Sequence, residues 1–144
     1  MLLAPNEFGA NIKTLAIAIV AMGVLFTVIF IPHLDSTGFF RAVLAQNLPS
    51  LKEGCIVSIL YVDAAAKPDA AVIKSSFEMA GYGPMEINRT VSDQHRSVTI
   101  ESSDSELLRD AGRAFQCVGV GATMRFTDSP QILLQIVVKN RIGY

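Results

Sequence analysis

The side chains best suited to catalysis in this chain gather around one of its two histidines. His95 ends the segment Ser92-Asp93-Gln94-His95, and Ser97 follows it closely. A serine nucleophile needs a base held in a fixed orientation and donors for the oxyanion beside it. Consecutive polar residues without that context are typical of an exposed turn. We therefore predict a hairpin tip at His95, and no catalytic residues.

Metal and cofactor sites find no support in the sequence. Asp93, His95 and Asp128 lack the spacing of metal ligands, and Cys55 lies far from Cys117. We therefore expect no metal, no cofactor and no small-molecule substrate.

The short motif Gly119-Val120-Gly121 follows a predicted helix, whereas phosphate-binding loops follow a strand and open a helix. We therefore interpret it as a helix exit.

His33 ends an apolar stretch, where contact with the membrane interface or a partner is expected. Asn88-Arg89-Thr90 matches the glycosylation acceptor pattern but lies in a predicted strand.

The charge distribution argues against nucleic acid and anionic lipid as partners. Twelve basic and thirteen acidic residues give a net charge of −1, and the basic residues are scattered along the chain. Nucleic-acid binding and recognition of anionic lipid both need a concentrated basic surface. We expect neither.

An uncharged stretch near the start of the chain predicts a membrane anchor. At about 1.5 Å of rise per residue, a helix over residues 14–32 spans the hydrocarbon core of a bilayer, roughly 30 Å. We predict a tail over residues 1–13 and a transmembrane helix over 14–34. Its membrane-spanning side chains are Leu15, Ile17, Ile19, Val20, Val24, Leu25, Phe26, Val28, Ile29, Phe30 and Ile31.

The anchor is expected to remain uncleaved and to cross the membrane once. Val43-Leu44-Ala45 has the spacing of a signal-peptidase site, but the apolar stretch ends at Pro32, too early for that site. Small residues at Ala18 and Ala21 favour contact with another membrane helix. Lysine and arginine counts give little bias, and a short tail before an anchor favours a domain outside the cytoplasm.

A short amphipathic segment follows the predicted anchor. Within residues 35–53, apolar residues recur at helical spacing, and two interpretations stay open. The helix lies at the lipid headgroups, or its apolar side packs on the soluble domain or on a partner. The candidate interfacial residues are Phe39, Phe40, Val43, Leu44 and Leu48.

The remaining residues, 54–144, predict a small soluble α+β domain. Periodicity and turn residues place seven elements in the order β-α-β-β-α-β-β. The first six match the βαββαβ order of ferredoxin-like domains, in which both helices cover one face of an antiparallel sheet. The expected elements are strand 56–62, helix 68–80, strands 85–91 and 96–101, helix 103–118, and strands 122–127 and 132–139.

Several local details follow from these patterns. Ser103 and Glu106 form a capping box at the start of the second helix, and Gly81 ends the first helix in a left-handed conformation. Strands 122–127 and 132–139 are expected to form a hairpin. The apolar run 132–138 is either a buried central strand or an edge strand open to a partner.

The polar face of the second helix carries Asp104, Glu106, Arg109, Asp110 and Arg113. It is either an ordinary solvated face or a docking surface.

The predicted topology places Cys55 and Cys117 near opposite ends of the sheet, too far apart for a disulfide, so both thiols are expected to be unpaired.

Two functions remain open, and an enzyme is a distant third. The first is a non-catalytic accessory, scaffold or assembly subunit of a membrane protein complex, of the secretion, pilus or energy-transducing type. In outline the chain resembles inner-membrane platform proteins of pilus and type II secretion machines, although it lacks their usual long coiled segment. The second is a membrane-tethered module that binds peptide or peptidoglycan. The expected partners are the lipid bilayer and other membrane subunits.

Overall fold

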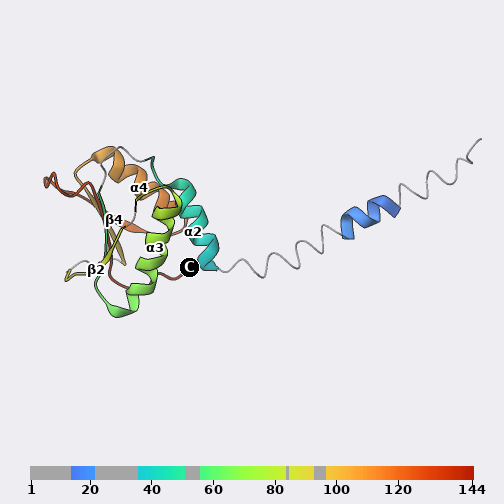
Figure 1. Ribbon diagram of the computed structural model, residues 1–144, viewed down its shortest axis with the longest axis horizontal. Helices are drawn as coiled ribbons and strands as arrows, with labels where there is room; N and C mark the ends of the chain where they lie inside the picture. Colours follow the sequence, from blue (N-terminus) through green and yellow to red (C-terminus); the bar gives the residue numbers. More distant parts are fainter. Residues whose placement is uncertain (1–13, 22–35, 51–55, 84, 93–96) are drawn as a thin grey trace, which may run out of the picture. The chain divides into compact units, whose positions relative to one another are not determined.

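Five strands form one mixed sheet in the computed structural model, which describes residues 14–21, 36–50, 56–83, 85–92 and 97–144 (Figure 1). The strand order is β2-β1-β5-β3-β4, so β2 and β4 form the two edges. The elements are α2 (Ser36–Asn47), β1 (Val57–Tyr61), η2 (Ala64–Ala66), α3 (Lys67–Met79), β2 (Ile87–Arg89), β3 (Val98–Ser102), α4 (Ser105–Cys117), β4 (Ala122–Phe126) and β5 (Leu134–Val138).

The sheet consists of two β-α-β units joined by a central strand. In the first unit, α3 connects β1 to its parallel neighbour β2; in the second, α4 connects β3 to its parallel neighbour β4. β5 lies between the units, parallel to β1 and antiparallel to β3. Ile136 of β5 is in register with Ile59 of β1 on one side and with Ile100 of β3 on the other.

The predicted mixture of helices and strands and the order of the seven elements are confirmed, but the ferredoxin-like topology is wrong. That topology requires an antiparallel sheet, whereas three of the four strand pairs here are parallel. The two expected hairpins are absent as well. β2 and β3 lie in different halves of the sheet, and β3 separates β4 from β5.

The composition of β5 explains its central position. Leu134, Ile136 and Val138 are fully buried, and Val137 on the opposite face is only 5% exposed. A strand that is buried on both faces belongs in the middle of a sheet, with neighbours on both sides. Of the two interpretations of the run 132–138, the buried central strand is therefore confirmed.

Local sequence accounts for the helix boundaries. Pro68 occupies the first turn of α3, where its missing N–H is tolerated, and Gly81 after the helix adopts a φ of 88°. The expected cap of α4 is shifted by one residue. Asp104 is the N-cap and accepts from the backbone N–H groups of Glu106 and Leu107, because the hydroxyl of Ser103 donates instead to the carbonyl of Ile132.

The α-helices α2, α3 and α4 all lie on one face of the sheet (Figure 1). α3 and α4 contact the strands, and α2 packs on α3 and α4. Ile73 and Phe77 of α3 and Ala111 and Phe115 of α4 are fully buried between the helices and the sheet. The opposite face of the sheet carries a polar row in register across four strands, Ser58, Gln135, Glu101 and Arg125.

The apolar residues that recur at helical spacing in α2 contribute to this core. Phe40 is 3% exposed, Leu44 is fully buried, and Leu48 packs against the same cluster. Of the two interpretations of the segment, packing on the domain therefore describes Phe40 and Leu44. Val43 is half-buried and Phe39 is exposed. The compact unit extends from Ser36 to Tyr144, so it begins earlier than the predicted boundary at residue 54.

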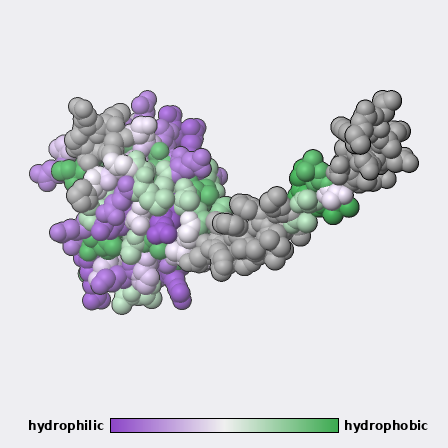
Figure 2. Space-filling model, turned by 45° about the vertical axis from the view of Figure 1, so that its right-hand side comes forward, coloured by the Kyte–Doolittle hydropathy of each residue, from purple (hydrophilic) through white to green (hydrophobic). Residues whose placement is uncertain are grey.

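Residues 14–21 belong to a separate unit and are helical. Their apolar side chains Leu15, Ile17, Ile19 and Val20 are exposed, and Figure 2 shows this stretch mainly in the colour of hydrophobic residues. Within the described part of the chain, no helix is both long enough and apolar enough to cross a membrane. Residues 22–34 of the predicted span, which include Val24, Leu25, Phe26, Val28, Ile29, Phe30 and Ile31, lie outside the described residues.

Candidate functional site

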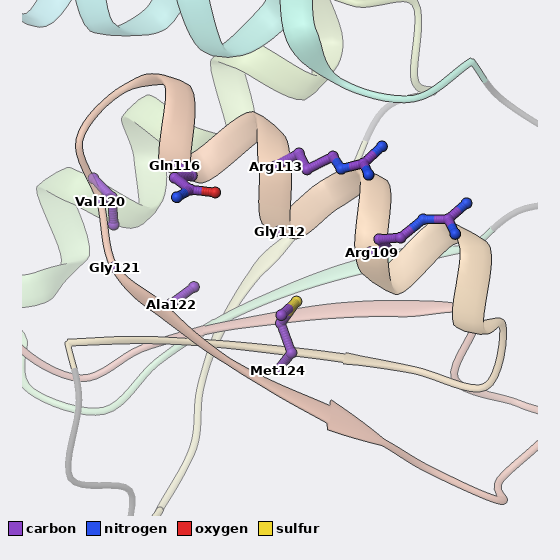
Figure 3. Close-up of a pocket in the computed structure, with 8 residues that line it drawn as sticks. All are labelled: Arg109, Gly112, Arg113, Gln116, Val120, Gly121, Ala122 and Met124. Atoms are coloured by element: carbon purple, nitrogen blue, oxygen red, sulfur yellow. The ribbon is translucent and has the colours of Figure 1, made fainter.

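A groove of about 370 Å³ lies between α4 and the edge strand β4 (Figure 3). The helix contributes its polar face, and the strand and the turn before it form the other wall. The residues that line the groove are Arg109, Gly112, Arg113, Gln116, Val120, Gly121, Ala122 and Met124.

The amphipathic sequence of α4 positions the helical wall. Leu107, Ala111, Ala114 and Phe115 point into the core and fix the rotation of the helix about its axis. Residues four apart on a helix lie on the same side, one turn apart. Arg109 and Arg113 therefore project from successive turns beside the groove (Figure 3).

The contact between Gly112 and Met124 shapes the floor of the groove. The Met124 side chain rises from β4 toward the helix at Gly112 (Figure 3). A β-carbon at position 112 would lie 2.5 Å from the sulfur of Met124, far inside normal contact distance. Glycine is unfavourable within a helix by about 1 kcal/mol relative to alanine. Its presence here allows β4 and its methionine to approach the helix.

β4 is open along its outer edge. No strand among the described residues pairs with that edge. The backbone N–H of Thr127 donates to the carbonyl of Ser102 in β3. Because backbone groups alternate in direction along a strand, those of Met124 and Phe126 face away from β3. The side chains of Met124 and Phe126 are 55% and 60% exposed, so the open edge of β4 presents two apolar side chains to solvent.

The charged groups that line the groove are both cationic. Nε of Arg109 lies 3.6 Å from Asp110, and Nη1 of Arg113 lies 3.8 Å from the same carboxylate oxygen. Exposed ion pairs of such length contribute little. Each guanidinium carries five N–H donors, most of which these contacts do not occupy. Arg125 of β4 is engaged elsewhere, because it pairs with Glu101 at 3.4 Å on the polar face of the sheet.

A second hollow of about 360 Å³ lies between the end of α2 and α4. Asn47, Pro49, Asp110, Arg113, Ala114 and Cys117 line it. Cys117 is exposed and free, in agreement with the expectation for this one thiol. Cys55 itself lies outside the described residues.

Among the other residues considered from the sequence, His33, Asp93 and His95 lie outside the described residues. The part of the chain that the structure describes contains no group of three potential metal ligands. Gly119 has a φ of 76° and ends α4, which confirms that the Gly119-Val120-Gly121 motif is a helix exit.

Sequence reasoning identified part of the groove. It named Arg109 and Arg113 as members of a polar face and left a docking surface open. It missed Gly112 and Met124, although a glycine inside a strongly amphipathic helix is a signal for close approach of another element.

Comparisons with known proteins add no relative. No family model matches the chain, and searches of curated proteins and of solved structures find no match.

Proposed function

We propose that this chain is a non-catalytic accessory or scaffold subunit of a membrane protein complex, which binds another subunit through the groove between α4 and β4. One observation carries the proposal. An unpaired strand edge with exposed Met124 and Phe126 lies beside a groove lined by two arginines. Open strand edges bind neighbouring chains readily. Proteins normally cover or blunt such edges, and a bound partner would cover this one.

Membrane attachment is the second part of the proposal and is supported by the sequence alone. The uncharged stretch over residues 14–32 has the length and composition of a single transmembrane helix. We place the domain on the periplasmic or extracellular side of that membrane. The exposed apolar side chains of residues 14–21 agree with an environment of lipid or of other membrane helices.

The alternative function is a membrane-tethered binding module, and the open edge of β4 favours peptide over peptidoglycan as its ligand. A membrane-tethered module that captures an extended peptide would use the backbone groups of Met124 and Phe126 in the same way. The two functions differ in the partner: a stable subunit of the complex in one case, a transient peptide in the other.

Site-directed photocrosslinking tests the binding surface. A photoreactive amino acid replaces Phe126 in the full chain, expressed in its native membrane, and the matched control carries it at Val91, which is exposed just beyond β2 at the other edge. We expect position 126 to crosslink to a defined membrane subunit that also co-purifies in mild detergent, and position 91 not to do so. A full chain that purifies alone and crosslinks at neither position would overturn the proposal.

Membrane attachment has its own test. Alkaline carbonate extraction should leave the full chain in the membrane pellet, and Val20→Arg combined with Val28→Arg should release it, because two charges within the span are unfavourable. A membrane-impermeant maleimide applied to intact cells should label Cys117, and a Cys117→Ser variant reports any labelling elsewhere. Extraction of the unmodified chain into the soluble fraction would contradict the anchor.

A further inference from the structure

We propose that the groove binds an extended acidic segment, which adds a strand to the outer edge of β4 and places two alternate carboxylates on Arg109 and Arg113. This inference rests on the proposed function and names the chemistry of the partner. The segment has the pattern acidic-x-acidic.

The backbone of β4 supplies the first part of the recognition. The N–H and C=O groups of Met124 and Phe126 face outward and are positioned to pair with an added strand. The other edge strand, β2, is shorter, with three residues against five in β4. The groove also adjoins β4, so side chains of the added strand that face the helices have space beside α4.

The spacing of the two arginines supplies the second part. Arg109 and Arg113 are four residues apart, which separates them by about 6 Å along the helix axis. Alternate residues of a strand point to the same face and lie about 6.6 Å apart. A strand with acidic residues at alternate positions therefore places one carboxylate opposite each guanidinium. The weak contacts with Asp110 leave donors available on both side chains.

Charge also argues against a second copy of this chain as the occupant. Antiparallel pairing of two β4 edges would bring both copies of α4 to the same face of the extended sheet. Each copy carries Arg109 and Arg113 on that side, so four guanidinium groups would face the junction. Repulsion between like charges disfavours such a dimer, whereas an acidic segment neutralises them.

The test is a titration of the ¹⁵N-labelled full chain in detergent micelles with the peptide acetyl-Thr-Glu-Val-Glu-Val-Thr-amide. We expect saturable amide shifts in residues 122–126 at peptide concentrations up to about 2 mM. The same peptide with both Glu replaced by Lys should bind at least about tenfold more weakly. N-methylation of alternate residues should abolish binding when it blocks the edge facing β4, and methylation of the other set should preserve it.

Protein variants assign the contacts. Arg109→Gln combined with Arg113→Gln should weaken binding about tenfold, because each charge-assisted contact contributes roughly threefold at an exposed site. Arg89→Gln, an exposed arginine in β2, is the control and should leave binding unchanged. Circular dichroism of each variant verifies folding before the titration.

Three results would overturn this inference: no saturable shift in β4, equal affinity for the Glu and Lys peptides, or shifts of the β4 amides on dilution without peptide, which would indicate self-association. A crosslink from position 126 to a subunit, together with failure of the acidic peptide, would reject the acidic strand alone. Absence of any crosslinked or co-purified subunit would reject the proposed function itself.

Discussion

The phenolic hydroxyl of Tyr144 donates a 2.9 Å hydrogen bond to the carboxylate of Asp69, which is only 3% exposed. The second oxygen of that carboxylate accepts the backbone N–H of Ile142 at 2.6 Å. The ring of Tyr144 stacks on Phe40 of α2 at a centroid distance of 4.7 Å. One buried acidic residue in the first turn of α3 therefore holds the C-terminal segment against two helices.

Replacing Asp69 with alanine should lower the free energy of unfolding by about 2–3 kcal/mol, because the buried N–H of Ile142 loses its acceptor. Urea denaturation followed by circular dichroism measures the change. Asp63→Ala is the matched control: Asp63 is exposed and its side chain caps no helix, so a change below about 0.5 kcal/mol is expected. Equal losses in the two variants would show that the Asp69 contacts do not stabilise the fold.

Stability should also fall at high pH through Tyr144. Burial, followed by the hydrogen bond to Asp69, raises the pKa of Tyr144 from 10.0 to about 12. The folded state thus retains a proton that the unfolded state releases. The stabilisation is present in full below pH 10 and is lost as pH rises from 10 through 12. Urea midpoints across that range should fall more steeply for the unmodified chain than for Tyr144→Phe. Identical slopes would contradict the raised pKa.

Gly112→Ala should be folded but should displace Met124. The gain in helix propensity, about 1 kcal/mol, opposes the clash between the new β-carbon and the sulfur of Met124. In a Met124→Ala background the clash is absent, so the same substitution should stabilise by nearly the full amount. Gly38→Ala in α2, where an added β-carbon meets nothing within 4 Å, is the control without a clash. Additive changes at positions 112 and 124 would refute the close contact.

Thr99→Val should stabilise the domain by about 1 kcal/mol. Thr99 is 1% exposed, and its hydroxyl has no hydrogen-bond partner among the described residues. A methyl group of the same shape removes the penalty of burying an unpaired hydroxyl. Thr123→Val, at the register partner in β4, is half-buried and should change stability by less than about 0.5 kcal/mol. Destabilisation by Thr99→Val in thermal unfolding would indicate that the hydroxyl is satisfied.

Local patterns predicted the elements well because local physics determines them. The apolar stripe that includes Leu107, Ala111 and Phe115 orients α4. Gly81 and Gly119 end their helices in the left-handed conformation that favours glycine. The predicted N-cap of α4 was wrong by one residue, because the hydroxyl of Ser103 donates to the carbonyl of Ile132, 29 residues away. A contact at that separation leaves no mark in the local sequence.

Strand pairing was not predictable in the same way. A polar segment between two strands favours a hairpin locally, yet β2 and β3 each pair elsewhere, because β1 and β5 offer more buried partners. The groove depended on this pairing. Arg109 and Arg113 were visible as a polar face, but only the placement of β4 at the edge turns that face into one wall of a groove.

The position of β5 has a consequence for how the chain matures. Among the described residues, no strand of one β-α-β unit pairs with a strand of the other, and β5 alone joins the two units in the sheet. During synthesis on a ribosome, both halves are translated before residues 134–138, which unite them. Until β5 is available, each half carries an uncovered apolar flank, and a chain interrupted before residue 134 would have no continuous sheet.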